Sequence, residues 1–456
     1  MAKTGIAKTG TPQRIVLATI GSLGDLHPML ALGLELKRRG HLVSIASSGY
    51  YRERIEGLGF GFHALRPNWD PTDAELIAQC EDIRRGPEVL FRQLVLPHLR
   101  DTYEDLHAAV ANADLMLAGE LVYAAPLVAE KLSSPWASVI LSPTSFFSAY
   151  DPSLLVNIPS VYRLRTAGPW VNRALLNFGK VVSRHWWKPV RQLRSELGLR
   201  VECDPVFRDK FAPELVLALF SKVLAQPQPD WPRQTVQPGF VFYDGLGNAK
   251  EDSAALHAFL DSGEAPIVFT QGSTAVHNAG SFYETSAAAA KALGRRALLI
   301  GAKDLGNEGL QEDATGRLLS VAYANYAEVF PRAAAIVHQG GSGTTGQALR
   351  AGKPQLIVPY GWDQPDNGER VARLGAGVCL ARTSYTPEAA AAALRRLLGS
   401  PESAGQEFAK EAARAAGQIR GEDALVSACD TIERIFVEAS IPSIGHKRKP
   451  AGNLVG

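Results

Sequence analysis

Residues 333–367, AAAIVHQGGSGTTGQALRAGKPQLIVPYGWDQPDN, constrain the fold more than any other stretch of the chain. A short apolar run at 334–337 is typical of a buried parallel strand, and the glycine-rich turn 339–343 follows it. Residues 344–351 have the pattern of a helix, and a second apolar run begins at residue 356. The stretch therefore predicts a strand, a glycine-rich loop, a helix and a second strand.

The loop of this unit is suited to bind an anion. The free backbone N–H groups of a helix N-terminus, and the positive end of its dipole, point at whatever lies on the loop. Glycines admit a ligand close to the backbone, and hydroxyl groups add donors. We expect a phosphate or diphosphate to contact His338, Gly340, Ser342, Gly343 and Thr344. Asp363 and Gln364 follow the second strand and are expected to hold sugar hydroxyls in the same crevice.

A second unit of the same plan lies near the N-terminus. An apolar run at 15–20 leads into the loop GSLGDLHP at 21–28, then into helical periodicity that ends near Gly40, and the next apolar run covers 42–46. Two such units, one in each half, predict two doubly wound, Rossmann-like α/β domains that face each other across a cleft. Further buried strands are expected at 115–118, 136–141, 215–220, 267–270 and 297–301.

The composition excludes several classes of protein. A chain of 456 residues with 46% hydrophobic and 21% charged residues is globular and too long for one core, and a net charge of +2 indicates no nucleic-acid partner. Its four cysteines lie far apart without metal-ligand spacing, which indicates reduced thiols. The polar N-terminus lacks the apolar core of a signal peptide, and no apolar run reaches the length of a membrane span. We therefore expect a cytoplasmic protein.

One segment has an unusual composition. Residues 160–200 contain nine Lys and Arg against a single acid, Glu196, and Trp170, Trp186 and Trp187 lie among them. One interpretation is a peripheral contact with the inner face of a membrane, with tryptophans at the depth of the headgroups. The other, which we favour, is an amphipathic lid whose aromatic residues lie in the core and whose cations are solvated.

The glycines of the first motif also fit a dinucleotide. Gly341, Gly343 and Gly346 satisfy G-x-G-x-x-G, and Asp363 lies 20 residues after Gly343, as the ribose-binding acid of such a site would. The pattern alone is weak. Two features distinguish this segment from a dinucleotide-binding site: a histidine directly before the glycines, and an Asp-Gln pair in place of a lone acid.

With these residues, the segment resembles the donor-binding signature of family 1 glycosyltransferases, whose bacterial members carry H-x-G-G-x-G-T-T, then A-G-x-P-Q and D-Q. The matching residues here are 338–345, 351–355 and 363–364. The resemblance covers nearly the whole chain, and the layout is most similar to that of the bacterial rhamnosyltransferase of rhamnolipid synthesis. It implies the GT-B fold and a nucleoside diphosphate sugar, of UDP or dTDP, as co-substrate without a bound cofactor.

The domain boundaries follow from the composition and from this resemblance. Prolines and glycines interrupt every periodic pattern between 226 and 247. The expected divisions are an acceptor-binding domain at 1–235, a nucleotide-sugar-binding domain at 236–422, a helix at 423–440 that packs back on the first domain, and a disordered tail at 441–456.

The general base is expected in the first loop. Plant members of the family have a histidine three residues before the proline of G-x-G-H-x-x-P; this position is Asp25 here, and several bacterial and sterol-directed members also have Asp. A carboxylate is a weak base for an alcohol unless burial raises its pKa or the acceptor is acidic. His27 is the reserve base or a packing residue at the helix start. Glu120 is the expected supporting acid or a solvated loop carboxylate.

Other donor contacts rest on the same resemblance. Ser273, in the turn FTQGST, is expected to meet the diphosphate or to cap a helix. Tyr323 aligns roughly with the tryptophan that stacks on the base in the family, or is an ordinary strand aromatic. Gly346 stands where the family has the glutamate that holds the ribose, and Gln347 is a substitute for it. No two aspartates are separated by one position, so we expect the loop, and no metal ion, to stabilise the leaving diphosphate.

The acceptor pocket is expected in the first domain. Its candidate residues are Phe146, Phe147, Tyr150 and Trp170, for each of which core packing is an equal explanation. We predict an inverting, metal-independent glycosyltransferase that moves a hexose to a hydroxyl of a lipophilic or phenolic small molecule. Three alternatives stay open: a nucleotide-sugar epimerase, an NAD-dependent oxidoreductase, and a non-catalytic sugar-nucleotide-binding helper protein.

Overall fold

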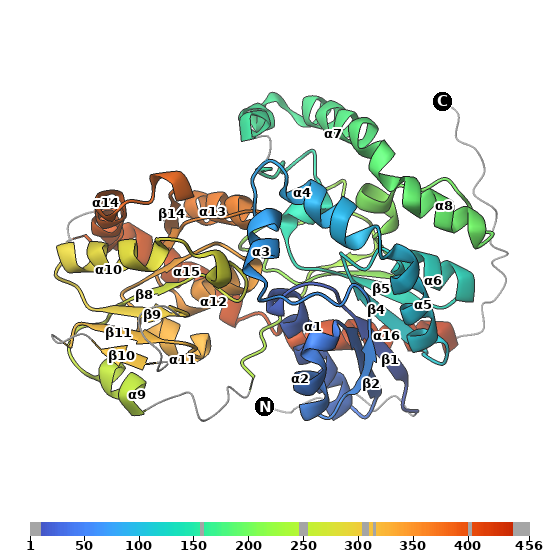
Figure 1. The fold of residues 1–456 in the computed structure, drawn as a ribbon, viewed down its shortest axis with the longest axis horizontal. Coiled ribbons are helices and arrows are strands. Elements are labelled where there is room, and N and C mark those ends of the chain that lie inside the picture. Colours follow the sequence, from blue (N-terminus) through green and yellow to red (C-terminus); the bar gives the residue numbers. More distant parts are fainter. Residues whose placement is uncertain are drawn as a thin grey trace.

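The computed structural model describes residues 11–155, 159–245, 254–302, 310–312, 316–399 and 404–440. The predicted disordered tail, 441–456, lies outside the described residues. The chain forms two α/β lobes that lie side by side (Figure 1), each built on a sheet of mostly buried, parallel strands. The predicted fold class, two Rossmann-like doubly wound domains, is confirmed.

The sheet of the first lobe has the strand order β3-β2-β1-β4-β5-β6-β7, with every pair parallel. Its strands are β1 (Arg14–Ala18), β2 (Leu42–Ser47), β3 (Gly61–Ala64), β4 (Leu115–Gly119), β5 (Trp136–Ile140), β6 (Leu215–Ala218) and β7 (Thr235–Val236). Its helices are α1 (Leu23–Arg38), α2 (Arg52–Gly57), α3 (Ala74–Cys80), α4 (Gly86–Glu88), α5 (Leu99–Val110), α6 (Ala125–Leu132), α7 (Pro169–Ser183) and α8 (Lys188–Glu196). Because the strand order reverses between β1 and β4, the loops after these two strands border a crevice.

The sheet of the second lobe has the order β10-β11-β9-β8-β12-β13-β14, in which only β10 is antiparallel to its neighbour. Its strands are β8 (Ile267–Thr270), β9 (Ala297–Ile300), β10 (Leu310–Glu312), β11 (Leu318–Val321), β12 (Ala335–His338), β13 (Gln355–Ile357) and β14 (Gly377–Cys379). Its helices are α9 (Ala254–Asp261), α10 (Phe282–Ala292), α11 (Tyr326–Val329), α12 (Ser342–Ala351), α13 (Gln364–Arg373), α14 (Pro387–Leu398) and α15 (Ala404–Arg420). The order reverses between β8 and β12, so the loops after these strands border the second crevice.

The last helix, α16 (Ala424–Ser440), returns to the first lobe. In Figure 1 it lies in red beside the blue elements of the N-terminal half. Ala428, Cys429 and Ile432 of α16 are fully buried in the same cluster as the inner face of α1. Arg39, at the end of α1, pairs with Asp430 at 2.6 Å, and this contact ties the two ends of the chain together. The second lobe is therefore attached to the first by two crossings of the chain.

Candidate active site

The glycine-rich loop after β12 leads directly into α12. The residue before the helix is Gly341, and no side chain caps the helix N-terminus. Ser342 is half-buried, Gly343 is exposed and Thr344 is buried, so a ligand can reach the backbone at the first turn. This arrangement leaves the first turn of α12 without a side-chain cap, and the binding of an anion there stays a prediction.

His338 at the end of β12 has both ring nitrogens occupied inside the protein. Its Nδ1 accepts a hydrogen bond from the Gly340 N–H at 3.0 Å, so its Nε2 carries the proton and donates to Gln355 Oε1 at 2.9 Å. The ring is fully buried, and burial lowers the pKa of His338 to about 4, which keeps it neutral. In this state His338 fixes the turn at Gly340. A hydrogen bond from Nε2 to a diphosphate would require the loss of the bond to Gln355, and that role stays a prediction.

Two glycines allow the loops after β8 and β12 to lie against their neighbours. Gly340 has a φ of +94°, and a Cβ there would lie 2.8 Å from Ile357 Cγ2 and 2.9 Å from the Gln364 carbonyl oxygen. Gly272 has a φ of +65°, and a Cβ there would lie 2.3 Å from the Gln339 Nε2. Neither position has room for a side chain, and both backbones are in the left-handed region that glycine favours.

We expect Gly340→Ala to lower the thermal unfolding midpoint clearly, because the substitution combines a strained φ with two contacts below 3 Å. Gly343→Ala is the matched control: a Cβ at Gly343 meets nothing within 4 Å. Differential scanning fluorimetry of both variants without ligand measures the difference. Equal midpoints for the two variants would show that the Gly340 turn is not constrained as described.

Asp363 joins the donor loop to α13. Its Oδ2 accepts hydrogen bonds from the Ser342 hydroxyl at 2.9 Å and from Asn367 Nδ2 at 2.8 Å. Burial raises the pKa of Asp363 above its ordinary value. The neighbouring Gln364 accepts from the backbone N–H groups of Tyr360 at 2.8 Å and Gly361 at 3.2 Å, which holds the turn before the helix. Both residues of the Asp-Gln pair are therefore fixed next to the first turn of α12.

Ser273 and Tyr323 follow the carboxyl ends of β8 and β11 at the same edge of the sheet. Ser273 is exposed, and the short helix that follows begins after Thr274, whose side chain makes no capping bond. The alternative interpretation of Ser273 as a helix cap is therefore wrong. Tyr323 is 44% exposed beyond β11, so a large part of its side-chain surface faces solvent. Their contacts with a nucleotide stay predictions.

Gly346, where the family resemblance implies a ribose-binding glutamate, faces the interdomain linker. A Cβ at Gly346 would lie 2.9 Å from the ring of Phe240. Phe240 is buried, so a longer side chain at Gly346 would displace a core ring. Gln347, the proposed substitute, donates to Asp244 Oδ1 at 3.1 Å. Its amide is thus engaged with the linker, and the linker occupies the space beside this turn of α12.

Asp25 lies at the first turn of α1, at the carboxyl edge of the first sheet. Its Oδ2 accepts from the Ser22 backbone N–H at 2.8 Å and from the Ser22 hydroxyl at 3.2 Å, and Ser22 caps the helix in return. Burial, together with the negative charges of Glu120 and Asp363, raises the pKa of Asp25 to about 6 against the two bonds from Ser22. Asp25 and Glu120 of the first lobe and Asp363 of the second therefore lie close enough for their charges to interact.

Glu120 has a buried cation as its partner. Lys210 Nζ lies 3.5 Å from Glu120 Oε2, with Lys210 only 7% exposed at its side chain. The ammonium also lies over the rings of Phe147, at 5.2 Å, and Phe211, at 5.3 Å. Lys210 was not among the predicted residues, and no motif surrounds it in the sequence. It supplies the positive charge that partly compensates the carboxylates of the cleft.

The reserve base, His27, packs elsewhere. Its ring lies 5.0 Å from that of Tyr243 in the linker, and burial lowers the pKa of His27 to about 4. Its Nε2 is buried and makes no hydrogen bond within the described part of the chain. The alternative interpretation of His27 as a packing residue at the start of α1 describes its position correctly, and its assignment as a base has no support from its surroundings.

The four acceptor candidates have different environments. Phe146 is 7% exposed and stacks on Trp231 at 4.1 Å, so this residue belongs to the core and its assignment to the acceptor pocket is wrong. Phe147 has a φ of +48° and packs on Phe207 at 4.7 Å. Tyr150 and Trp170 are 45% and 84% exposed. The last three stay candidates.

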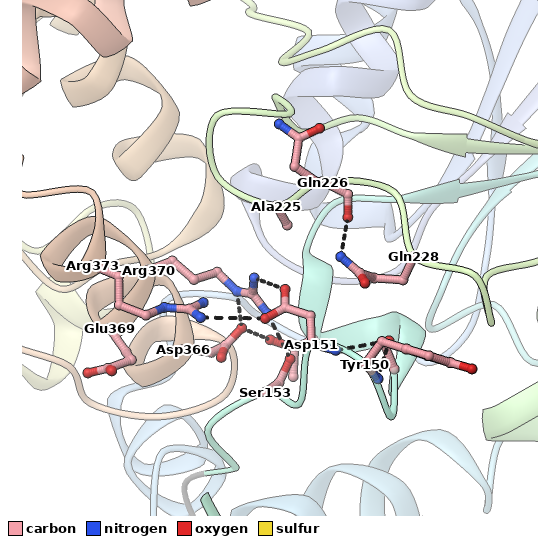
Figure 2. A network of polar contacts seen from close by, with 12 residues as sticks. Tyr150, Asp151, Ser153, Ala225, Gln226, Gln228, Asp366, Glu369, Arg370 and Arg373 are labelled. Carbon is pink, nitrogen blue, oxygen red and sulfur yellow. Dashed lines mark hydrogen bonds and ion pairs between the residues drawn. The ribbon is translucent and has the colours of Figure 1, made fainter. Parts of the chain in front are cut away.

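A buried network joins α13 of the second lobe to the first lobe (Figure 2). Asp366 of α13 is fully buried and accepts from the Leu154 N–H at 2.8 Å and the Thr144 hydroxyl at 3.2 Å, both in the first lobe. Arg370 donates to Asp366 at 2.7 Å and pairs with Asp151. The helix that carries Asp363 and Gln364 is therefore fixed to the loop that carries the acceptor candidates.

Trp362, another residue that was not predicted, precedes the Asp-Gln pair. It has a φ of +59°, which is rare for a large side chain and often marks a functional site. Its ring packs against the core of the first lobe, in the cluster that contains Tyr123 and Trp187. The tryptophan thus contacts the first lobe directly before the residues expected to hold the sugar.

Comparisons with known proteins show the family of the chain. Residues 15–146 match the glycosyltransferase family 28 N-terminal domain, and residues 313–418 match the C-terminal domain of erythromycin biosynthesis protein CIII-like proteins. The O-mycaminosyltylonolide 6-deoxyallosyltransferase of Streptomyces fradiae is 32% identical over 439 residues, which cover 92% of this chain and 97% of the relative. The vancomycin aglycone glucosyltransferase of Amycolatopsis orientalis is 28% identical over 91% of this chain and 96% of its own length.

Solved structures share the fold. The glycosyltransferase of kitacinnamycin superposes with a TM-score of 0.67 at 22% identity, over 93% of this chain and 98% of that one. VinC, solved in complex with dTDP, superposes with a TM-score of 0.63 at 19% identity, over 93% and 100%. Similarity along almost the full length of both chains shows that this protein belongs to the GT-B glycosyltransferases of the macrolide-glycosyltransferase family, enzymes that transfer a sugar from a nucleoside diphosphate to a small molecule.

Proposed function

We propose that the protein is an inverting, metal-independent glycosyltransferase that moves a hexose from dTDP, in preference to UDP, to a hydroxyl of an apolar small molecule. The observation that carries the proposal is that Asp363, bonded to Ser342 at the uncapped N-terminus of α12, lies close enough to Asp25 and Glu120 for their charges to interact. The choice of thymidine nucleotide is supported by the dTDP bound to VinC and to the spinosyn rhamnosyltransferase SpnG. The Streptomyces fradiae relative is named for transfer of a deoxyhexose, which agrees with that choice.

In the proposed reaction, Asp25 accepts the proton of the acceptor hydroxyl while the hydroxyl oxygen attacks C1 of the sugar. The bond from C1 to the diphosphate oxygen breaks, and its electron pair leaves with the diphosphate. The N–H groups at the start of α12, with Ser273, stabilise the charge that develops there. Asp363 and Gln364 hold the sugar. Because the base and the leaving-group loop belong to opposite lobes, a single displacement with inversion is expected.

Membership of the glycosyltransferase family sets aside the epimerase, the oxidoreductase and the non-catalytic helper. The finer resemblance to the rhamnolipid rhamnosyltransferase stays a prediction. An apolar acceptor is supported by Phe147, Tyr150 and Trp170, which carry aromatic surface in or next to the loop that α13 binds. Among the residues that the structure describes, no helix is long and apolar enough to cross a membrane.

A nucleotide panel tests the proposal. We expect dTDP to raise the thermal midpoint most, UDP less and NAD not at all, because a ligand stabilises the fold according to its concentration relative to Kd, by about 2.7 kcal/mol at a hundredfold excess. The order should be the same in EDTA, since backbone N–H groups bind the diphosphate. The same panel on Gly340→Ala should give smaller shifts. The proposal fails if neither nucleotide shifts the midpoint at millimolar concentration, or if the shift requires Mg²⁺.

A further inference from the structure

Helix α7 presents an apolar face to solvent. Trp170 is 84% exposed, Phe178 68%, Val181 72% and Val182 54%. Phe178 lies eight residues after Trp170, and Val181 and Val182 follow Phe178 by three and four residues. These separations place the four side chains on one side of the helix, together with Ala174. No element of the described chain covers this side, and a contiguous exposed patch of large apolar side chains marks an interaction surface.

Two polar residues of α7 contact the protein. Asn172 is buried and donates to the carbonyl oxygens of Ala149, at 3.0 Å, and Arg165, at 3.2 Å. Lys180 lies over the Phe207 ring at 5.0 Å. In Figure 1, α7 and α8 run in green along the outer side of the first lobe. Trp170 is thus exposed on α7, whereas Trp187 packs in the core with Phe91 and Tyr123.

Exposed basic residues precede and follow α7 along the chain. Arg163, Arg184 and Lys188 are exposed, and within the described ranges none of them forms an ion pair. The sequence contains no acid between Asp151 and Glu196. A surface that complements both features must be apolar within and negatively charged at its boundary. A bilayer of anionic phospholipids has this structure, because acyl chains lie beneath negative headgroups.

We propose that the apolar face of α7, with Arg163, Arg184 and Lys188, docks the protein on an anionic phospholipid surface. Trp170 and Phe178 insert at the depth of the headgroups, and the three cations contact the phosphates. The inference rests on these side chains and does not depend on the proposed donor or base. For an enzyme that acts on apolar acceptors, docking would place a candidate acceptor residue near the membrane. Asn172 joins the docked helix to residue 149, next to the exposed ring of Tyr150.

Sedimentation with vesicles tests the proposal. The wild-type protein should bind vesicles of phosphatidylglycerol and phosphatidylcholine at least tenfold more tightly than vesicles of phosphatidylcholine alone, because each basic residue near an anionic surface contributes about a fivefold gain in affinity. Phe178→Asp with Val181→Asp, and separately Arg184→Glu with Lys188→Glu, should each weaken binding at least tenfold. Leu42→Asp is the matched control, because Leu42 is 59% exposed in β2, away from α7 in Figure 1.

Two further readouts separate docking from other roles of α7. Binding should shift tryptophan fluorescence to shorter wavelength in the wild type and not in the Phe178→Asp, Val181→Asp variant. The thermal midpoint without ligand should be the same in all variants, which shows that they fold. The proposal is overturned if the wild type does not bind anionic vesicles or if the variants bind like the wild type. A lipid-free dimer that the aspartates convert to a monomer in light scattering would overturn it as well, and would identify the face as a protein interface.

Discussion

Asp25→Asn is expected to lower kcat by about a thousandfold and to leave dTDP binding unchanged, because a positioned general base contributes about 10² to 10⁴ in rate. The amide oxygen of asparagine can still accept the hydrogen bond that Ser22 N–H donates to Asp25 at 2.8 Å. The capping box of α1 is thus largely preserved. The variant removes the base and leaves the first turn of the helix intact. Steady-state kinetics and a dTDP thermal shift measure the two effects.

The pH dependence of kcat/KM also tests Asp25 as the base. Asp25 must be ionised to accept a proton, and its pKa is raised to about 6, so kcat/KM should rise with pH through about 6 and level off above. The charge of Glu120 raises this pKa, so Glu120→Gln should move the rise to lower pH. The bond from the Ser22 hydroxyl also lowers it, so Ser22→Ala, which keeps the backbone bond, should move the rise slightly to higher pH and cost about 1 kcal/mol of stability through the lost cap. A full rate for Asp25→Asn, or shifts of the same sign in both variants, would contradict the assignment.

The central strands could be predicted because helices cover both faces of a parallel sheet and leave continuous apolar runs. The runs expected at 15–20, 42–46, 115–118 and 136–141 correspond to β1, β2, β4 and β5. The strands not predicted include β3, β7, β10 and β14, which are the four sheet edges. At β3, GFHA, each side chain is partly or fully exposed, so no apolar run marks the strand.

The site could be predicted where chemistry follows a strand end. Asp25, Glu120 and Asp363 follow the carboxyl ends of β1, β4 and β13, and those of β1 and β4 border the first crevice. The internal role of His338 was missed although its partner, Gln355, lies in the A-G-x-P-Q motif. Lys210 could not be predicted, because its approach to Glu120 depends on the path of the chain after α8 and not on any local pattern.

Arg370 shows the same limit, because Asp366 and Arg370 have the spacing of an ordinary surface ion pair on a helix. In the structure their side chains are 0% and 2% exposed, and both bind the first lobe. Asp366 accepts hydrogen bonds from residues 144 and 154 across the interface. Residues that become buried only where two lobes meet leave no hydrophobic periodicity in the sequence of either lobe.

Arg370→Met is expected to lower the free energy of unfolding by about 3–5 kcal/mol, because removing one partner of a buried ion pair leaves the other charges uncompensated. Asp366 would be left without its cation in the interior, and Asp151 would retain only Arg373, at 3.6 Å. Methionine fills most of the volume of the arginine stem, so the loss reports charge more than packing. Urea denaturation and the thermal midpoint measure the change.

Arg373→Met is the matched control on the same helix. Arg373 pairs with the same Asp151 but is 40% exposed, so its loss should cost less than about 1 kcal/mol. In the Arg370→Met background, Asp366→Asn should recover part of the stability, because it removes the uncompensated charge and keeps an acceptor for the Leu154 N–H. Equal costs for the two arginine variants, or no recovery in the double variant, would contradict the interdomain role. If the network also positions the loop at 151–154, Arg370→Met should raise KM for the acceptor more than that for the nucleotide sugar, since Arg370 donates to Asp151 and Ser153 in this loop (Figure 2).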